Sequence, residues 1–221
     1  MTGQRYVILG AGGHAKVVIA TVEAADGTVV RVLDDDRSLH GTRVLGHTVE
    51  GPIADELIQD DAKVVVAIGA NRARAAVAAR LRCAFGTVVH PSAVVHPSVR
   101  LGYGTVVLAG AVLQPSVAIG AHVIVNTCAS VDHDCMLGDF VHIAPGCRLA
   151  GDVRLEEGAF MGIGGVAIPG TRVGRWATIG AGAVVVTAIG PGVLAVGVPA
   201  RVVRTPAGER NASPQSGRDN A

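Results

Sequence analysis

An aliphatic residue recurs at every sixth position of this chain, from Val89 to Val185, without a break. A fixed period of six is typical of a parallel β-helix, in which each short unit buries its apolar side chain only by stacking on the next unit. The period fits neither an α-helix nor an alternating strand. If three units form one triangular coil, the run predicts between five and six coils. The series consists of Val89, Val95, Leu101, Val107, Leu113, Ile119, Val125, Val131, Leu137, Ile143, Leu149, Leu155, Met161, Ala167, Val173, Ile179 and Val185.

The composition of the chain agrees with a β-helix and limits the possible partners. The 221 residues include 30 Gly and 3% aromatic residues, which is too little aromatic material for a conventional core. The formal net charge of +1 gives no reason to expect nucleic acid or an anionic membrane as a partner. No apolar stretch approaches the roughly 20 residues that span a bilayer, and the first residues do not resemble a signal peptide. We therefore expect a cytoplasmic protein without membrane insertion.

The four cysteines are predicted to be structural. Cys135 and Cys147 lie four residues after an aliphatic position, in a register of small residues that we expect to be buried. Cys83 falls in a stretch that we interpret as helical, and Cys128 lies elsewhere in a coil. No CxxC pair is present, so we expect no metal site.

Residues 1–85 follow a different pattern, which predicts a small Rossmann-like α/β domain with three parallel strands in the order βαβαβ. Residues 86–204 would form the all-β helix, and the polar tail 205–221 would be disordered. Parallel strands joined by helices bind ligands beyond their carboxyl ends, which here carry the Gly10 turn, Asp34 and Gly69. The expected strands cover 6–9, 29–33 and 63–68, and the expected helices cover 14–24, 53–59 and 71–82, the last with Asn71 as its cap.

The turn GAGGHA at residues 10–15 satisfies the G-x-G-x-x-A dinucleotide fingerprint, with Asp34 where a ribose-binding acid would stand. Glycines let a ligand approach the backbone, and amides at a helix N-terminus attract phosphate. A full dinucleotide site needs a second βαβ half, which is missing here. The pattern therefore favours a mononucleotide, as part of a nucleotide sugar, over NAD, while a purely structural turn remains an alternative. The acidic run Asp34–Asp36 alone is more typical of a solvated loop.

Within the hexads, the segment from Val131 to Cys135 stands out because it contains a histidine flanked by two acidic residues. Val131 and Cys135 hold inward registers, so His133 and Asp134 should lie on an outward corner. Such a pair is either an ordinary surface turn or a general base whose adjacent carboxylate fixes the imidazole tautomer. His142, nine residues later, could face the same groove or be a core histidine. We assign no role to His90, His96 or His122.

Five segments, taken in order, resemble one family over nearly the whole chain up to about Arg204. They read GAGGHAKVV, LDDD, AIGANRAR, VNTCASVDHDC and AVGVPARVV. The chain resembles the bacterial nucleotide-sugar acetyltransferases of the hexapeptide-repeat superfamily that acylate 4-amino sugars, as in the perosamine and bacillosamine pathways. It is also similar to the related sialic acid O-acetyltransferases.

The resemblance implies a left-handed β-helix and a homotrimer whose active sites lie between neighbouring subunits. It implies that His133 is the base, that Asp134 increases its basicity and that acetyl-CoA is the donor. Family members often have Gly at position 181 and Glu at position 134, where this chain has Ala and Asp. By the same resemblance, Gly12, Gly13 and His14 in the Gly10 turn contact the nucleotide sugar, Asp34, Asp35 and Gly69 lie nearby, and His142, Ile163 and Ala181 meet acetyl-CoA.

The function that we expect is direct acetyl transfer from acetyl-CoA to the amine of a GDP- or UDP-linked 4-amino sugar. An O-acetyltransferase acting on sialic acid would use the same base. A γ-type carbonic anhydrase is a weaker alternative, because it requires histidines five apart and the gaps between the solenoid histidines here are 6, 26, 11 and 9. A non-catalytic protein that binds a nucleotide sugar is the remaining alternative.

Overall fold

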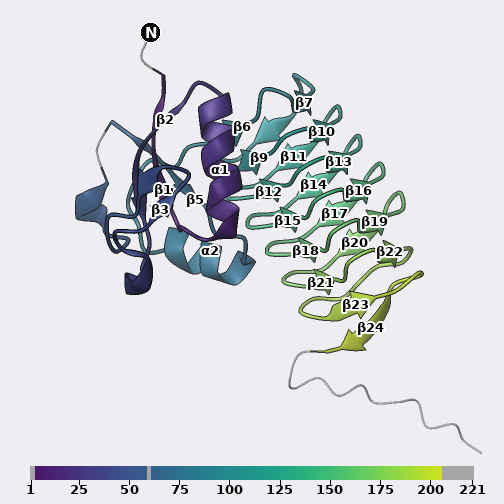
Figure 1. Ribbon diagram of the computed structural model, residues 1–221. Helices are drawn as coiled ribbons and strands as arrows, with labels where there is room; N and C mark the ends of the chain where they lie inside the picture. The colour runs from purple at the N-terminus through teal and green to yellow at the C-terminus, as the bar shows by residue number, and fades with distance from the viewer. Residues whose placement is uncertain (1–2, 59–60, 206–221) are drawn as a thin grey trace, which may run out of the picture.

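The computed structural model describes residues 3–58 and 61–205, which form a small α/β unit beside a long parallel β-solenoid (Figure 1). The α/β unit has the predicted three-stranded parallel sheet, and its strands lie in the order β2-β1-β5. Its remaining elements are two α-helices, a short antiparallel hairpin and two single-turn 3-10 helices. The bounds are β1 Arg5–Leu9, α1 Gly13–Ala24, β2 Thr28–Leu33, η1 Arg37–Leu39, β3 Arg43–Val44, β4 His47–Thr48, η2 Asp55–Leu57, β5 Lys63–Val66 and α2 Asn71–Ala78.

The helix predicted over 53–59 is wrong, since only the 3-10 turn η2 forms there and Gln59 lies outside the described residues. Hydrogen bonds to distant parts of the chain hold this segment in an irregular path. The backbone N–H of Ile53 donates to Asp35 Oδ1 at 3.0 Å, and Asp55 Oδ1 accepts from the backbone N–H of Arg82 at 3.4 Å. Ala54 between them is extended, which prevents a helix from starting earlier.

Helix α2 also differs from its prediction. It ends at Ala78 instead of residue 82, because the chain turns away to pair Phe85 with Val64, and Cys83 therefore lies outside any helix. The N-cap is Ala70, which makes no side-chain cap. The predicted cap Asn71 instead donates its amide to the carbonyl oxygens of Gly158 and Ala159 in the solenoid.

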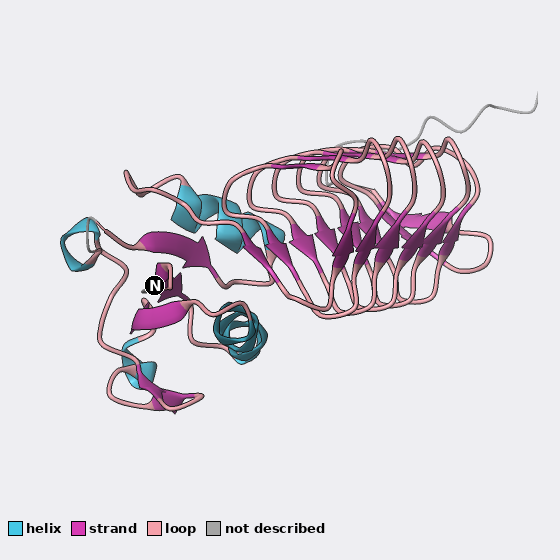
Figure 2. Ribbon diagram, turned by 90° about the horizontal axis from the view of Figure 1, so that it is seen from above, coloured by secondary structure: helices cyan, strands magenta, loops and turns pink. Residues whose placement is uncertain are grey.

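The solenoid has about six turns, consistent with the predicted left-handed β-helix. Its two-residue strands stack into three parallel sheets, which we call the first, second and third faces (Figure 2). The first face contains β6 Val88–Val89, β9 Val106–Val107, β12 Ile124–Val125, β15 His142–Ile143, β18 Phe160–Met161, β21 Thr178–Ile179, β23 Leu194–Val196 and the antiparallel β24 Arg201–Arg204. The second face contains β7 Val94–Val95, β10 Val112–Leu113, β13 Ser130–Val131, β16 Arg148–Leu149, β19 Val166–Ala167 and β22 Val184–Val185. The third face contains β8 Arg100–Leu101, β11 Ala118–Ile119, β14 Met136–Leu137, β17 Arg154–Leu155 and β20 Arg172–Val173.

The aliphatic series points inward and forms the core of the column, as the period of six predicts. From Val107 to Val185 every member is at most 5% exposed. Cys135 and Cys147 are fully buried in the same core, which confirms their predicted register. Each strand therefore places its first residue on the outside, and these outer residues determine the character of each face.

The α/β unit covers the start of the first face, where outer residues Val88, Val106 and Ile124 pack into one cluster with α1 and β1. Arg74 of α2 stabilises this contact, although no carboxylate of the described residues accepts from it. Its guanidinium is 1% exposed and donates to the carbonyl oxygens of His122 and Phe140 in the solenoid. It also donates to Ile68 O and Gly69 O within the α/β unit. The ends of β1 and β5 are thereby held beside the coils.

Candidate active site

His133 lies on the edge between the second and third faces, where the chain turns after β13. Its Nδ1 lies 2.8 Å from Asp134 Oδ2, so Nδ1–H donates to the carboxylate and Nε2 keeps a lone pair. Asp134 adopts the left-handed conformation with φ +62°, which Asp tolerates better than most residues. Both side chains are more than 60% exposed. The predicted outward corner is therefore present, with a histidine oriented by its neighbour.

The surroundings of His133 increase the basicity of its imidazole. Its hydrogen bond to Asp134 raises the pKa of His133 above the ordinary value, and the charges of Asp132 and Asp152 act in the same direction. Gly151, at the equivalent place in the next coil, leaves room for the ring, because a β-carbon there would come 2.5 Å from Cε1. Basicity and space are thus provided by two successive coil corners.

His142 lies on the first face, so within one chain it does not share a groove with His133, contrary to one of the two sequence interpretations. Both of its ring nitrogens are occupied. Nδ1–H donates to Gly69 O at 3.1 Å, and Nε2 accepts from the amide of Asn126 at 3.1 Å. Burial, together with the positive charge of Arg74, lowers the pKa of His142 to about 3. His142 is therefore a neutral, fixed ring and has no free nitrogen to act as a base.

His14, in the first turn of α1, lies next to His142 with 6.0 Å between ring centroids. Its Nε2 is buried and has no hydrogen-bond partner among the described residues. Burial and Arg74 lower the pKa of His14 to about 4. The Cβ of His14 lies 3.8 Å from the place where Gly69 would carry a β-carbon. The structure thus brings together three predicted positions, His14, Gly69 and His142, at the contact between the two units.

The glycine turn is held by Asp34, whose Oδ2 accepts from the backbone N–H of Ala11 at 2.7 Å. Gly10 has φ +106° and its β-carbon would press on Ala67 O at 3.1 Å, so only glycine fits well there. Gly12 and Gly13 face open space at the start of α1, where a ligand could approach the backbone. Asp35 instead forms an ion pair with Arg80 at 2.8 Å. Asp34 and Asp35 therefore both bond to other parts of the fold, which the expectation of a solvated loop did not include.

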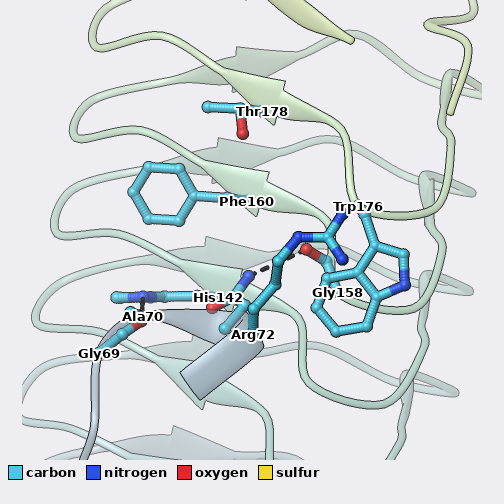
Figure 3. Close-up of a pocket in the computed structure, with 9 residues that line it drawn as sticks. Gly69, Ala70, Arg72, His142, Gly158, Phe160, Trp176 and Thr178 are labelled. Carbon is cyan, nitrogen blue, oxygen red and sulfur yellow. Dashed lines mark hydrogen bonds between the residues drawn. The ribbon is translucent and has the colours of Figure 1, made fainter. Parts of the chain in front are cut away.

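A cavity of about 580 Å³ opens where α2 meets the first face (Figure 3). On its solenoid wall, His142, Phe160 and Thr178 stand one above another on successive coils. Arg72 of α2 lies over the ring of Trp176, which belongs to the solenoid turn before β21, with 4.6 Å from Cζ to the ring centroid. The full lining is Gly69, Ala70, Asn71, Arg72, His142, Gly158, Phe160, Trp176 and Thr178.

Ile163 and Ala181 lie on the edge between the first and second faces, one coil apart. The backbone N–H of Gly182 donates to Ile163 O at 2.8 Å, which stacks the two turns directly. Ile163 is 58% exposed although it is aliphatic. This edge borders the face that carries the cavity, while His133 lies on the opposite edge of the second face. One chain therefore holds the two halves of the predicted site apart.

Sequence reasoning missed four residues at the cavity: Arg72, Phe160, Trp176 and Thr178. Phe160 and Thr178 hold the same outward register as His142, eighteen and thirty-six residues before them. That spacing is the signal that could have found them. Trp176 is the single tryptophan of the chain, which is a weaker signal.

Two findings on the described residues bear on alternative functions. Residues 3–58 and 61–205 contain no group of three or more His, Cys, Asp or Glu side chains placed to hold a metal ion. None of the helices in this part of the chain is long and apolar enough to cross a bilayer.

A solenoid of hexads that carries a glycine-turn α/β unit at its start is an architecture that this chain shares with known nucleotide-sugar acetyltransferases. Residues 5–81 match the model of the PglD N-terminal domain family. PerB from Caulobacter crescentus, in complex with CoA and GDP-perosamine, is 42% identical with a TM-score of 0.84, over 91% of this chain and 98% of that one. The acetyltransferase domain of PglB from Neisseria gonorrhoeae, in complex with acetyl coenzyme A, is 38% identical with a TM-score of 0.82, over 91% and 100%.

The chain belongs to this family of hexapeptide-repeat nucleotide-sugar acetyltransferases. A curated relative shares only a segment with it. The bifunctional protein GlmU from Rubrobacter xylanophilus is 49% identical over 59 residues, which are 27% of this chain and 13% of GlmU.

Proposed function

We propose that this enzyme transfers the acetyl group of acetyl-CoA to the amino group of a nucleotide-linked 4-amino sugar, with His133 as the general base. The observation that carries the proposal is the His133–Asp134 pair at 2.8 Å, on an open edge of the solenoid. The similarity to PerB in complex with CoA and GDP-perosamine supports both the donor and the class of acceptor.

In the proposed reaction, His133 Nε2 takes a proton from the sugar amine as its nitrogen attacks the thioester carbonyl. A carbon–nitrogen bond forms and the carbon–sulfur bond breaks. The imidazolium then returns the proton to the departing sulfur of CoA. Asp134 keeps Nδ1–H in place throughout and stabilises the imidazolium, so no covalent enzyme intermediate is needed.

The acceptor would bind along the carboxyl edge of the β2-β1-β5 sheet. Gly12, Gly13 and His14 offer open backbone and the N-terminus of α1 to the nucleotide, with Asp34 and Asp35 beside them. From there the ligand would pass Gly69 into the cavity. Acetyl-CoA would run along the other side of the same cavity, past the backbone of Ile163 and Ala181 and the fixed ring of His142.

A homotrimer would complete the site, because His133 and the cavity lie on different sides of one chain. The second face offers the contact. Its outer residues are mostly aliphatic (Val94, Val112, Ser130, Arg148, Val166 and Val184), whereas those of the third face include three exposed arginines. If three copies turn their second faces inward, His133 of one copy approaches Ile163 and Ala181 of the next.

An O-acetyltransferase acting on sialic acid remains the second candidate, because a histidine base serves an alcohol as well as an amine. A thiol-release assay with acetyl-CoA separates the candidates when it is run against GDP- and UDP-linked 4-amino sugars and against sialic acids. Release only with the amino sugars supports the proposal, and release only with sialic acids overturns it. If CoA does not bind at all, the chain is a non-catalytic nucleotide-sugar-binding protein.

His133→Ala is the matching variant. We expect it to lose most of the turnover while remaining folded and trimeric, since the side chain is exposed. Normal turnover in this variant would overturn the assignment of the base.

A further inference from the structure

Arg72 brings into the candidate cavity a positive charge that no acid balances. The cavity lining contains no Asp or Glu, and His142 in its wall is held neutral. Within residues 3–58 and 61–205, the Arg72 side chain forms no ion pair or hydrogen bond, and its guanidinium lies over the ring of Trp176. Its guanidinium therefore keeps its donors available to a ligand.

The charge of Arg72 adds to a local excess of positive charge. Arg72 lies in the first turn of α2, where unpaired backbone N–H groups already make the potential positive. This turn contains no acidic residue. Two residues later, the buried Arg74 donates, among the described residues, only to carbonyl oxygens and to the Asn71 amide oxygen. A cation at a helix N-terminus is unfavourable by itself, and an anion bound there would relieve the repulsion.

Trp176 holds Arg72 in a defined position. The indole lies flat over Gly158, where any β-carbon would collide with it, so glycine at that corner makes room for the ring. A planar guanidinium stacks well on an indole, which restricts the arginine without consuming its hydrogen-bond donors. Figure 3 shows the pair across the cavity from His142. Arg72 is thus preorganised to receive an anion.

The start of α2 also lies next to the predicted nucleotide site. Strands β1 and β5 are neighbours and parallel, so the helices that follow them begin at the same edge of the sheet. The position of a Gly69 β-carbon, 3.8 Å from His14 Cβ, confirms that the two helix starts are close. A nucleotide bound over Gly12 and Gly13 would therefore reach Arg72 through the groups attached to its ribose.

We propose that Arg72, held on Trp176, binds the diphosphate of the nucleotide-linked sugar and so positions the sugar in the cavity. The inference rests on the proposed function and adds to it a positioning contact. A guanidinium recognises phosphate oxygens through two parallel N–H···O bonds, which a lysine cannot reproduce. Acetyl-CoA also contains a diphosphate, so the test must distinguish the two ligands.

Trp176 makes the test direct, because it is the only tryptophan of the chain and its fluorescence reports on this cavity alone. GDP, UDP and CoA would be titrated separately into the full-length protein, with calorimetry in parallel. The variants are Arg72→Ala and Arg72→Lys. The matched control is Arg82→Ala, an exposed arginine beyond the far end of α2.

We expect GDP or UDP to change the fluorescence of the wild type, and Arg72→Ala to weaken that binding about 10-fold, as loss of a charged hydrogen-bonding contact does. Arg72→Lys should recover part of the loss, and Arg82→Ala should bind like the wild type. In steady-state kinetics, the KM for the nucleotide sugar should rise while kcat and the KM for acetyl-CoA stay within about 2-fold.

Unchanged nucleoside diphosphate affinity in Arg72→Ala would overturn the inference. A loss confined to CoA would also overturn it, since the diphosphate would then belong to the other substrate. These binding measurements do not require turnover. If the wild type binds nucleoside diphosphates through Arg72 and transfers no acetyl group, the proposed function fails and the anion site stands.

Discussion

The imidazole of His133 lies over the backbone of Gly151, which occupies the same corner one coil later. A β-carbon built on Gly151 would come 2.5 Å from Cε1 and 2.7 Å from Nε2 of that ring. A side chain at position 151 would therefore displace the His133 ring. A substitution there should change the geometry of catalysis without changing the fold.

Gly151→Ala should lower kcat by about 10- to 100-fold, because a displacement of about 1 Å in a catalytic group has costs of this size. The methyl group meets the end of an exposed side chain that can rotate away, so the melting temperature should change little. Gly190→Ala, at a position with open space, is the control. Wild-type turnover in Gly151→Ala would show that His133 is not the base.

The pH dependence of kcat/KM should follow the protonation of His133. Only the neutral imidazole accepts a proton, so activity should rise with pH through a pKa that Asp134 raises above its ordinary value. Asp134→Asn removes the main cause of that shift. The acidic limb of its profile should move to lower pH, with a reduced plateau because the ring is less well oriented. A limb at the same pH in both proteins would contradict the role of Asp134.

Acid stability should depend on His122, which is buried between Phe85 and Phe140 and has a pKa lowered to about 4, mainly by burial. The unfolded chain binds a proton at this histidine below pH 6.5, whereas the folded chain stays neutral down to about pH 4. The free energy of unfolding must therefore fall as the pH is lowered through this window, by at most about 1.4 kcal/mol per pH unit from this residue and by less where water screens the ring.

His122→Phe should make the melting temperature less sensitive to pH between 6.5 and 4. Phenylalanine fits this corner, because Phe140 adopts the same left-handed conformation one coil later. His14 and His142 also have lowered pKa values and remain in the variant, so part of the acid sensitivity should persist. Thermal melts at several pH values measure the effect, and identical slopes for both proteins would rule out His122 as a contributor.

Arg74→Met should destabilise the contact between the α/β unit and the solenoid by about 3 kcal/mol or more. Methionine fills much of the space but leaves buried carbonyl oxygens of His122 and Phe140 without donors. Denaturant melts provide the measurement, with the exposed Arg82→Met as control. If the stability lost in Arg74→Met were no larger than that lost in the control, the hydrogen bonds of Arg74 would contribute little to the stability of the contact.

Val166→Lys on the second face should convert the proposed trimer into monomers, because three lysines would meet at the axis. Met136→Lys, at the exposed outer position of the third face, should leave the trimer intact. Molar mass from light scattering distinguishes these outcomes. If Val166→Lys monomers retained full acetyl transfer, the site would not need residues from two chains.

The periodic parts of the molecule could be predicted from sequence, because in a solenoid each residue's direction follows from its place in the repeat. Cys135 and Cys147 were assigned to the interior on register alone. His142 shows where this reasoning fails. Its register points outward, yet it is buried, since a unit folded some seventy residues earlier covers that face. The prediction of Asn71 as a helix cap fails for the same reason, because its partners Gly158 and Ala159 lie on the solenoid.

The carbonyl oxygen of Gly69 accepts from both Arg74 and His142, so one atom at the end of β5 joins the sheet to the coils. These hydrogen bonds oppose any sliding of the two units past each other. We expect the enzyme to select the acceptor atom by distance. A nucleotide anchored at the glycine turn would present to the active site the atom that lies at a fixed distance along the column. Selection among positional isomers of the sugar would then depend on the distance between the nucleotide and the acceptor atom.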